Sequence, residues 1–218
     1  MKRLCWISML LLVPFLRADS APEEVAANVE RRLRALTSIS GDFEQLYYSM
    51  SVSAPLREKG RFYFQKPDWM KWEYGPPERN VWLYKDGIFL FYIPEENQLV
   101  RSRASQQLYE SEILTIFSGR KDLKNDYLVE TSPFPAGGKN VEQIKLTPRT
   151  EEECAYILLE VDGRTWLIRT AIFFDWAGNK QEFRFSRVKT DSRLSPDVFK
   201  LEVPPGCEII EEDDVIKN

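Results

Sequence analysis

Apolar and polar residues alternate along most of the chain after Ser40, and this alternation limits the possible folds more than any other feature. A period of two places successive side chains on opposite faces of a β-strand. Short polar breaks such as Lys85-Asp86-Gly87 separate the alternating segments and are typical of hairpin turns. About ten strands follow one another in this way, which predicts an antiparallel meander that closes or nearly closes into a barrel.

Two segments have a helical period instead. Residues 20–37 carry one apolar stripe at helical spacing, formed by Val25, Val29, Leu33 and Leu36. Residues 105–119 supply a second set of apolar side chains, including Leu114 and Phe117. The predicted fold class is therefore mainly β, of the α+β kind.

The first 18 residues have the plan of a secretory signal peptide. A short basic start precedes an apolar run from Leu4 to Leu16, and small residues follow the run. The run is short for a bilayer span and Pro14 interrupts it, so we favour a cleaved peptide over an uncleaved anchor. We expect removal of residues 1–18, a single domain over residues 19–218, and a soluble, monomeric exported protein.

The composition excludes several kinds of function. The chain has no histidine, which removes the commonest general base and the commonest metal ligand. A net charge of −4 without a basic tail argues against a nucleic-acid partner. Runs of carboxylates such as residues 151–153 are more typical of solvated loops than of acid-base sites. We therefore expect no enzymatic activity, no cofactor and no metal site.

Two cysteines, Cys154 and Cys207, remain after the signal segment. They are too few for a four-cysteine zinc site. In an exported protein they can form a disulfide, but they can equally be two separate thiols, because sequence does not show proximity. Both alternatives stay open at this point.

An aromatic-rich stretch, YFQKPDWMKWEYGPP at residues 63–77, raises the question of a binding face. The alternation puts one set of side chains on a common face: Phe62, Phe64, Lys66, Met70 and Trp72. It puts a polar set on the opposite face, where we expect water: Arg61, Tyr63, Gln65, Lys71 and Glu73. Lys66 is the exception on the apolar face, because an unpaired ammonium is costly to bury. It either lies at the rim with its head in water or donates to carbonyl groups of a covering segment.

Several motifs, taken in order, resemble the outer-membrane lipoprotein carrier protein family (LolA-like). They are Leu33, ISGDFEQ at 39–45, GRFYFQKP at 60–67, WEY at 72–74, the YKDG turn before IFLFYIP, and the C-terminal SPDVFKLEVPPG. The resemblance implies a half-open antiparallel β-barrel whose apolar concave face is covered by lid helices. It also implies a periplasmic carrier that accepts acylated lipoproteins from an inner-membrane transporter and passes them to an outer-membrane receptor.

On this resemblance we assign the acyl-chain site to Leu33, Phe43, Phe62, Phe64, Met70, Trp72, Leu114 and Phe117. In the family an arginine stands where this chain has Lys66 and ties the lid shut. Lysine donates similar hydrogen bonds but lacks the planar fork of arginine. We expect Lys66 to act as a lid latch that donates to backbone carbonyls around residues 105–119. The alternative function is a sensor or regulatory module of the same fold that binds a lipid or protein signal without handing it on.

Overall fold

The computed structural model describes residues 21–51, 53–103, 112–117, 119, 121–135, 137–150 and 154–212. Its helical elements are α1 (Pro22–Ala35), α3 (Glu112–Phe117), α4 (Leu123–Asp126) and the 3₁₀ turns η1 (Pro94–Glu96) and η2 (Pro196–Phe199). Its first six strands are β1 (Ser38–Tyr48), β2 (Leu56–Gln65), β3 (Trp69–Tyr74), β4 (Val81–Lys85), β5 (Ile88–Ile93) and β6 (Gln98–Arg103). The other six are β7 (Tyr127–Thr131), β8 (Val141–Pro148), β9 (Cys154–Asp162), β10 (Ile168–Asp175), β11 (Lys180–Thr190) and β12 (Glu208–Glu212).

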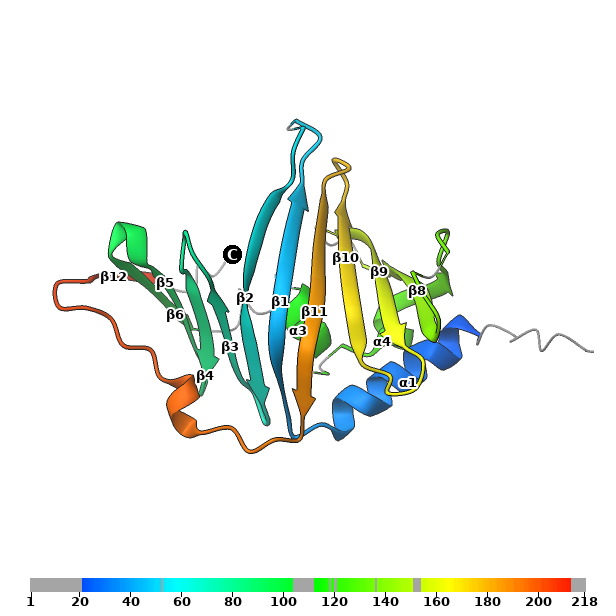
Figure 1. Ribbon diagram of the computed structural model, residues 1–218, viewed down its shortest axis with the longest axis horizontal. Helices are drawn as coiled ribbons and strands as arrows, with labels where there is room; N and C mark the ends of the chain where they lie inside the picture. The colour runs from blue at the N-terminus through cyan, green and yellow to red at the C-terminus, as the bar shows by residue number, and fades with distance from the viewer. Residues whose placement is uncertain are drawn as a thin grey trace, which may run out of the picture.

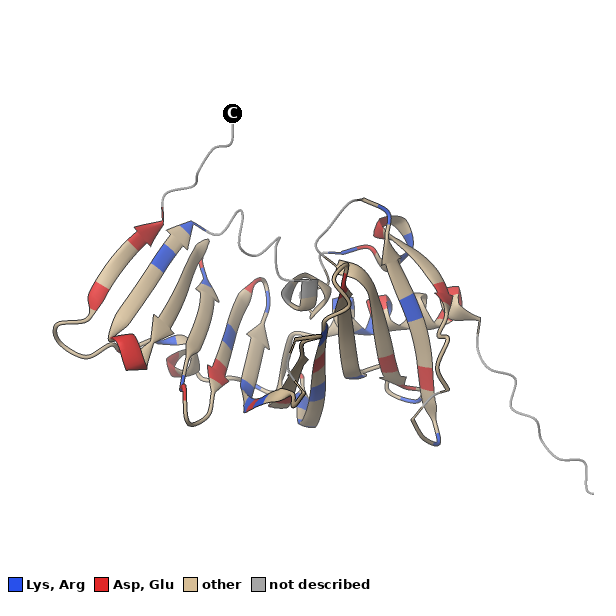
Figure 2. Ribbon diagram, turned by 90° about the horizontal axis from the view of Figure 1, so that it is seen from above, with Lys and Arg blue, Asp and Glu red and all other residues tan. Residues whose placement is uncertain are grey.

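The strands form one sheet in the order β12-β6-β5-β4-β3-β2-β1-β11-β10-β9-β8-β7 (Figure 1). Neighbouring strands run antiparallel except β12, which pairs parallel with β6. The two end strands, β12 and β7, do not pair with each other, so the sheet curves into a trough without closing (Figure 2). This confirms the predicted class of a half-open, mainly antiparallel barrel.

Two glycines serve the geometry of this sheet. Asp86 and Gly87 have φ values of 52° and 80°, the left-handed backbone that the tight turn between β4 and β5 requires. Gly60 on β2 faces the trough where the backbone comes close to its neighbours. A Cβ atom there would lie 2.2 Å from the Glu73 carbonyl oxygen and 2.6 Å from the Phe43 ring. The absence of a side chain at residue 60 therefore leaves the space that Phe43 fills.

The helices lie against the concave side of the sheet, and α3 is seen in the angle between its two halves (Figure 2). Helix α1 packs near β7, β8 and α4. Its apolar stripe forms as predicted at Val25, Val29 and Leu33; Leu36 is buried too, but it follows the end of the helix. The second predicted helix, over residues 105–119, is described only from Glu112 to Phe117, and residues 104–111 lie outside the described part. Sheet and helices share one core.

The C-terminal segment corrects one expectation. After β11 the chain runs along the lower edge of the sheet in Figure 1, through η2, before it reaches β12. The Phe199 ring lies 5.5 Å from the Trp69 ring, and the Lys71 ammonium donates to the Lys200 carbonyl at 2.9 Å. Lys71 also pairs with Glu73 at 2.9 Å and is buried. The prediction that Lys71 lies in water was therefore wrong, because a segment far along the chain covers this part of the convex face.

Within the described residues, no helix combines the length and the apolar character needed to cross a membrane.

Candidate functional site

Aromatic side chains from four adjoining strands meet on the concave face of the sheet. The ring centroids of Phe43 on β1 and Trp72 on β3 are 4.7 Å apart, and Phe62 on β2 stacks on Trp72 at 5.5 Å. Phe185 on β11 lies 5.3 Å from Phe62 and 6.2 Å from Trp72. Such pairs attract each other beyond the effect of burial alone. The centre of the trough is thus a continuous aromatic surface.

The residues predicted for the acyl site come together in one core. Those whose side chains are described are all buried members of it: Leu33, Phe43, Phe62, Phe64, Met70, Trp72 and Phe117. Leu114 belongs to α3, but its side chain lies outside the described part of the structure. The strand alternation therefore placed the sheet residues on the correct face. Their role in binding acyl chains stays a prediction.

Two further parts of the same face were not predicted from the sequence. Phe183 and Phe185 of β11 extend the central aromatic group; Phe183 lies 5.8 Å from Trp72. Trp82 of β4 and Phe91 of β5 stack at 4.0 Å nearer to the β12 end of the sheet, where both are only half-buried. The alternation in QEFRFSRV, NVWLYK and IFLFYIP carries this information, because it assigns these residues to one face of their strands.

The helices fill the trough with their own apolar side chains. Phe117 of α3 packs edge-on against Phe62 at 5.8 Å and lies 4.8 Å from Phe185. Ile113 and Ile116 of α3 and Leu33 of α1 belong to the same buried core. In this structure the helical side chains therefore cover the central aromatic surface.

One polar group in this surface, the indole N–H of Trp72, is buried and lacks a hydrogen-bond acceptor among the described residues. A buried donor without an acceptor is costly, on the order of 1–3 kcal/mol. The other polar pair on this face is satisfied, since the Tyr74 hydroxyl donates to Gln45 Oε1 at 2.6 Å. Burial raises the pKa of Tyr74, so this phenol stays neutral.

Lys66 directly follows the end of β2, and its acceptor differs from the predicted one. Its ammonium donates to the backbone carbonyl of Arg34, and its backbone N–H donates to the Thr37 carbonyl at 2.9 Å. Arg34 is in the last turn of α1, where helix carbonyls lack partners within the helix. Lys66 thus connects the end of β2 to α1. The placement of its acceptor in residues 105–119 was wrong, because α1 ends beside the end of β2.

The structure contains no disulfide between Cys154 and Cys207. Cys154 begins β9 and is buried, whereas Cys207 precedes β12 and is partly exposed. These strands lie toward opposite ends of the sheet. The disulfide alternative is therefore not realised, because most of the sheet separates the two thiols.

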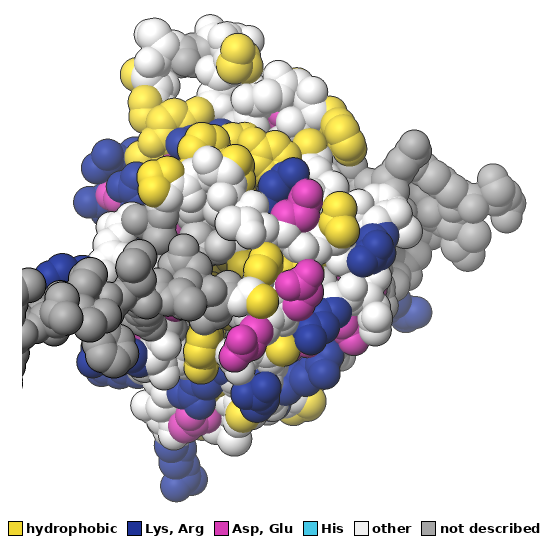
Figure 3. Space-filling view, turned by 90° about the vertical axis from the view of Figure 1, so that its right-hand side faces the viewer, with side chains coloured by type: hydrophobic (Ala, Val, Ile, Leu, Met, Phe, Trp, Pro, Cys, Tyr) yellow, Lys and Arg dark blue, Asp and Glu magenta, His cyan; other side chains and the backbone are white. Residues whose placement is uncertain are grey.

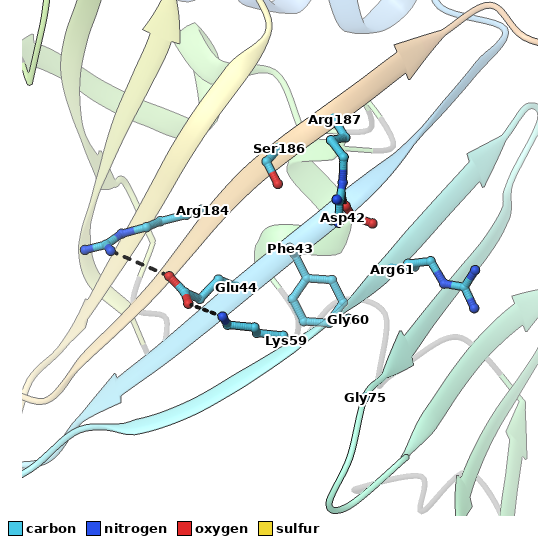
Figure 4. Close-up of a pocket in the computed structure, with 10 residues that line it drawn as sticks. All are labelled: Asp42, Phe43, Glu44, Lys59, Gly60, Arg61, Gly75, Arg184, Ser186 and Arg187. Atoms are coloured by element: carbon cyan, nitrogen blue, oxygen red, sulfur yellow. Dashed lines mark hydrogen bonds and ion pairs between the residues drawn. The ribbon is translucent and has the colours of Figure 1, made fainter.

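The convex face carries a cleft of a different character. Its volume is about 540 Å³, and Figure 4 shows charged side chains from β1, β2 and β11 around it. Glu44 pairs with Lys59 at 3.4 Å and with Arg184 at 3.7 Å, and Arg187 pairs with Asp42. These charges are matched and solvent-exposed, which suits a stable outer surface better than a site for an apolar ligand. The described residues contain no cluster of acidic or cysteine side chains that could hold a metal ion.

Comparison with known proteins agrees with this arrangement. The family described as outer membrane lipoprotein carrier protein LolA matches residues 34–202. An outer-membrane lipoprotein carrier protein from Methylococcus capsulatus is 24% identical over 210 residues, covering 93% of this chain and 97% of the relative. The corresponding protein from Nitrosospira multiformis is 24% identical over 176 residues, covering 80% of this chain and 83% of the relative.

Solved structures share the fold. A conserved protein from Thermus thermophilus gives a TM-score of 0.56 at 14% identity, covering 87% of this chain and 98% of that one. MucB gives a TM-score of 0.51 at 14% identity, covering 87% of this chain but 65% of MucB. MucB has also been solved in a complex with MucA from Pseudomonas aeruginosa. At these identities the likeness concerns the fold alone.

Proposed function

This chain belongs to the outer membrane lipoprotein carrier protein LolA family, and from that premise we propose that it carries acylated lipoproteins across the periplasm. It accepts the acyl chains from an inner-membrane transporter, holds them on the concave face of the sheet, and passes them to an outer-membrane receptor. Residues 1–18 serve as the export signal, and residues 19–218 act as one monomeric domain. The chain performs no catalysis and needs no cofactor.

The observation that carries this proposal is the nature of the contact between helices and sheet. The central aromatic surface is covered by separate apolar side chains of α1 and α3 rather than by a second sheet. Acyl chains would replace these side chains at a similar burial per unit area, about 25 cal/mol per Å². The loaded and the empty protein therefore differ little in free energy. A carrier requires this, because it must both bind and release its ligand.

The unpaired indole N–H of Trp72 adds a preference for acylated ligands. When the helices move aside, this donor becomes available to an ester or amide carbonyl at the head of an acyl chain. The ligand then removes a cost that the closed form bears. A hydrocarbon without a carbonyl gains the burial but not this hydrogen bond.

Photo-crosslinking tests the site. A photoreactive residue at Leu33 or Phe91, which face the trough, should trap lipoprotein in the periplasm. The same residue at Tyr63 or Lys59, on the convex side of β2, should not. Lys71 is unsuitable as a control because the C-terminal segment covers it. Equal trapping from both faces would contradict the proposal. Mass spectrometry of the co-purified ligand separates acylated lipoproteins from free fatty acid or phospholipid.

The second candidate is a binding module that does not hand its ligand on. The shared fold with MucB favours it, because MucB forms a complex with a protein partner. The likeness covers 87% of this chain and 65% of MucB, so it concerns only that part of MucB. A transfer assay distinguishes the two: a carrier delivers bound lipoprotein to receptor-containing membranes, whereas a sensor keeps it.

A further inference from the structure

Two neighbouring hairpin ends expose apolar side chains that the proposed cargo site does not use. They are the β1–β2 end at residues 47–56 and the β10–β11 end at residues 175–180, side by side at the top of Figure 1. Among the described residues, most of the exposed large apolar side chains are in these ends: Tyr47 (39% exposed), Met50 (78%), Leu56 (57%) and Trp176 (73%). In the space-filling view hydrophobic side chains gather toward this same end of the molecule (Figure 3).

The two ends form one ordered surface. Strands β1 and β11 pair up to Tyr48 and Lys180 at the base of the ends. Above that pair, the Met50 backbone N–H donates to Asn179 Oδ1 at 3.1 Å. Asn179 in turn donates to both Asp175 carboxylate oxygens, at 2.8 and 2.7 Å. The two hairpin turns, which carry the exposed apolar side chains, are therefore tied to each other.

The charge pattern around these ends points to a lipid surface. Residues 49–56 (SMSVSAPL) and 176–179 (WAGN) carry no charge, although 29% of the whole chain is charged. Charges begin just outside these segments. Arg57 follows Leu56 and pairs with Glu44 at 3.3 Å. Lys180 pairs with Glu182 at 3.2 Å, and its ammonium lies 3.8 Å from the centre of the Tyr48 ring. Asp175 precedes Trp176 and is bound by Asn179. Trp and Tyr favour the interface between hydrocarbon and headgroups, and cations beside them can reach lipid phosphates.

We propose that the paired hairpin ends touch the surface of a phospholipid membrane, with Met50 and Trp176 entering the headgroup layer. A narrow protruding end suits a bilayer better than a folded protein, because a stable protein interface needs about 800 Å² on each partner. The protein is acidic overall, at −4, so apolar side chains rather than net charge drive the contact. With few inserted side chains the contact is weak and reversible. It concerns the empty protein as much as the loaded one and does not depend on the proposed cargo.

Flotation of the purified empty protein with phosphatidylethanolamine–phosphatidylglycerol vesicles tests this contact. The double variant Met50→Ser/Trp176→Ser should bind these vesicles about tenfold more weakly than the parent, which corresponds to about 1.4 kcal/mol. The matched control Leu128→Ser/Phe134→Ser removes two exposed apolar side chains from β7 and the following loop and should bind like the parent. In addition, brominated lipids should quench tryptophan fluorescence more in the parent than in Trp176→Phe.

Three results would overturn the proposal. The parent binds no vesicles, or both double variants bind vesicles equally well, or Met50→Ser/Trp176→Ser binds vesicles like the parent and loses binding only to a protein partner. The last would assign the hairpin ends to protein docking instead. Lipopeptide binding by Met50→Ser/Trp176→Ser provides an independent readout. It should match the parent, so a failure of the membrane contact is distinguishable from a failure of the cargo site.

Discussion

Replacing Lys66 with leucine removes the ammonium that connects the end of β2 to the last turn of α1. In the closed form this group donates to the Arg34 carbonyl, a helix-end acceptor without a partner within the helix. Its positive charge also lies at the negative end of the helix dipole. Lys66→Leu keeps much of the side-chain bulk but loses both interactions.

The size of this effect follows from the surroundings of Lys66. A hydrogen bond with a charged donor contributes roughly 1.5–3 kcal/mol. Lys66 is half-exposed, so water screens its charge. Ordering its long side chain also costs conformational entropy. We expect a net contribution of about 1 kcal/mol to remain. The buried side chains of α1 contribute far more, at roughly 1.5–3 kcal/mol each for Val25, Val29 and Leu33. Helix α1 therefore stays docked on the sheet in Lys66→Leu. The equilibrium constant for its undocking rises by a factor of about five.

Two measurements should change together. Hydrogen exchange of the amides near the end of α1 should be about fivefold faster in the empty variant. Because the closed form competes with ligand, the Kd for a fluorescent diacylated lipopeptide should fall by a similar factor, and its release should slow. Lys66→Arg should behave like the parent, and so should Lys139→Leu, which replaces an exposed lysine outside this contact. If Lys66→Leu changes neither exchange nor Kd, Lys66 is only a rim residue with its head in water.

Three further predictions concern other parts of the molecule. Trp72→Phe should weaken binding of a diacyl (ester) lipopeptide severalfold but leave its dialkyl (ether) analogue nearly unaffected; equal losses for both ligands would reject the carbonyl contact at the indole N–H. For Asp162, burial opposes ionisation, but hydrogen bonds from Thr165, Arg164 and Arg169 outweigh it and hold the pKa well below its usual range. The stabilisation is therefore present at neutral pH and is lost as pH falls below the unfolded-state pKa of about 4. Urea midpoints should drop more between pH 7 and pH 3 for the parent than for Asp162→Asn, and equal drops would contradict this. Thiol labelling of the denatured, unreduced protein should modify both Cys154 and Cys207; protection of the pair would mean that a disulfide forms.

The sequence by itself determined which side chains share a face. A period of two is a local property of the backbone, so it assigned Phe62, Phe64, Met70 and Trp72 to one face without knowledge of the partner strands. All four are buried on that face. The apolar stripe of α1 was readable for the same reason, because helical spacing is local as well. Within β1–β6 and within β7–β11 the order of strands followed from their short connections, but the pairing of β1 with β11 did not.

Only the tertiary structure decided what lies opposite these faces. Lys71 has a typical outward position in its strand, yet the C-terminal segment, 129 residues further along, covers it. The acceptor of Lys66 depends on where α1 ends relative to β2, and the separation of Cys154 from Cys207 depends on the order of strands across the sheet. The parallel pairing of β12 with β6 likewise joins segments that are distant along the chain. Such contacts form because non-local burial outweighs the entropy of closing long loops, and a local pattern contains no record of which distant segment supplies that burial.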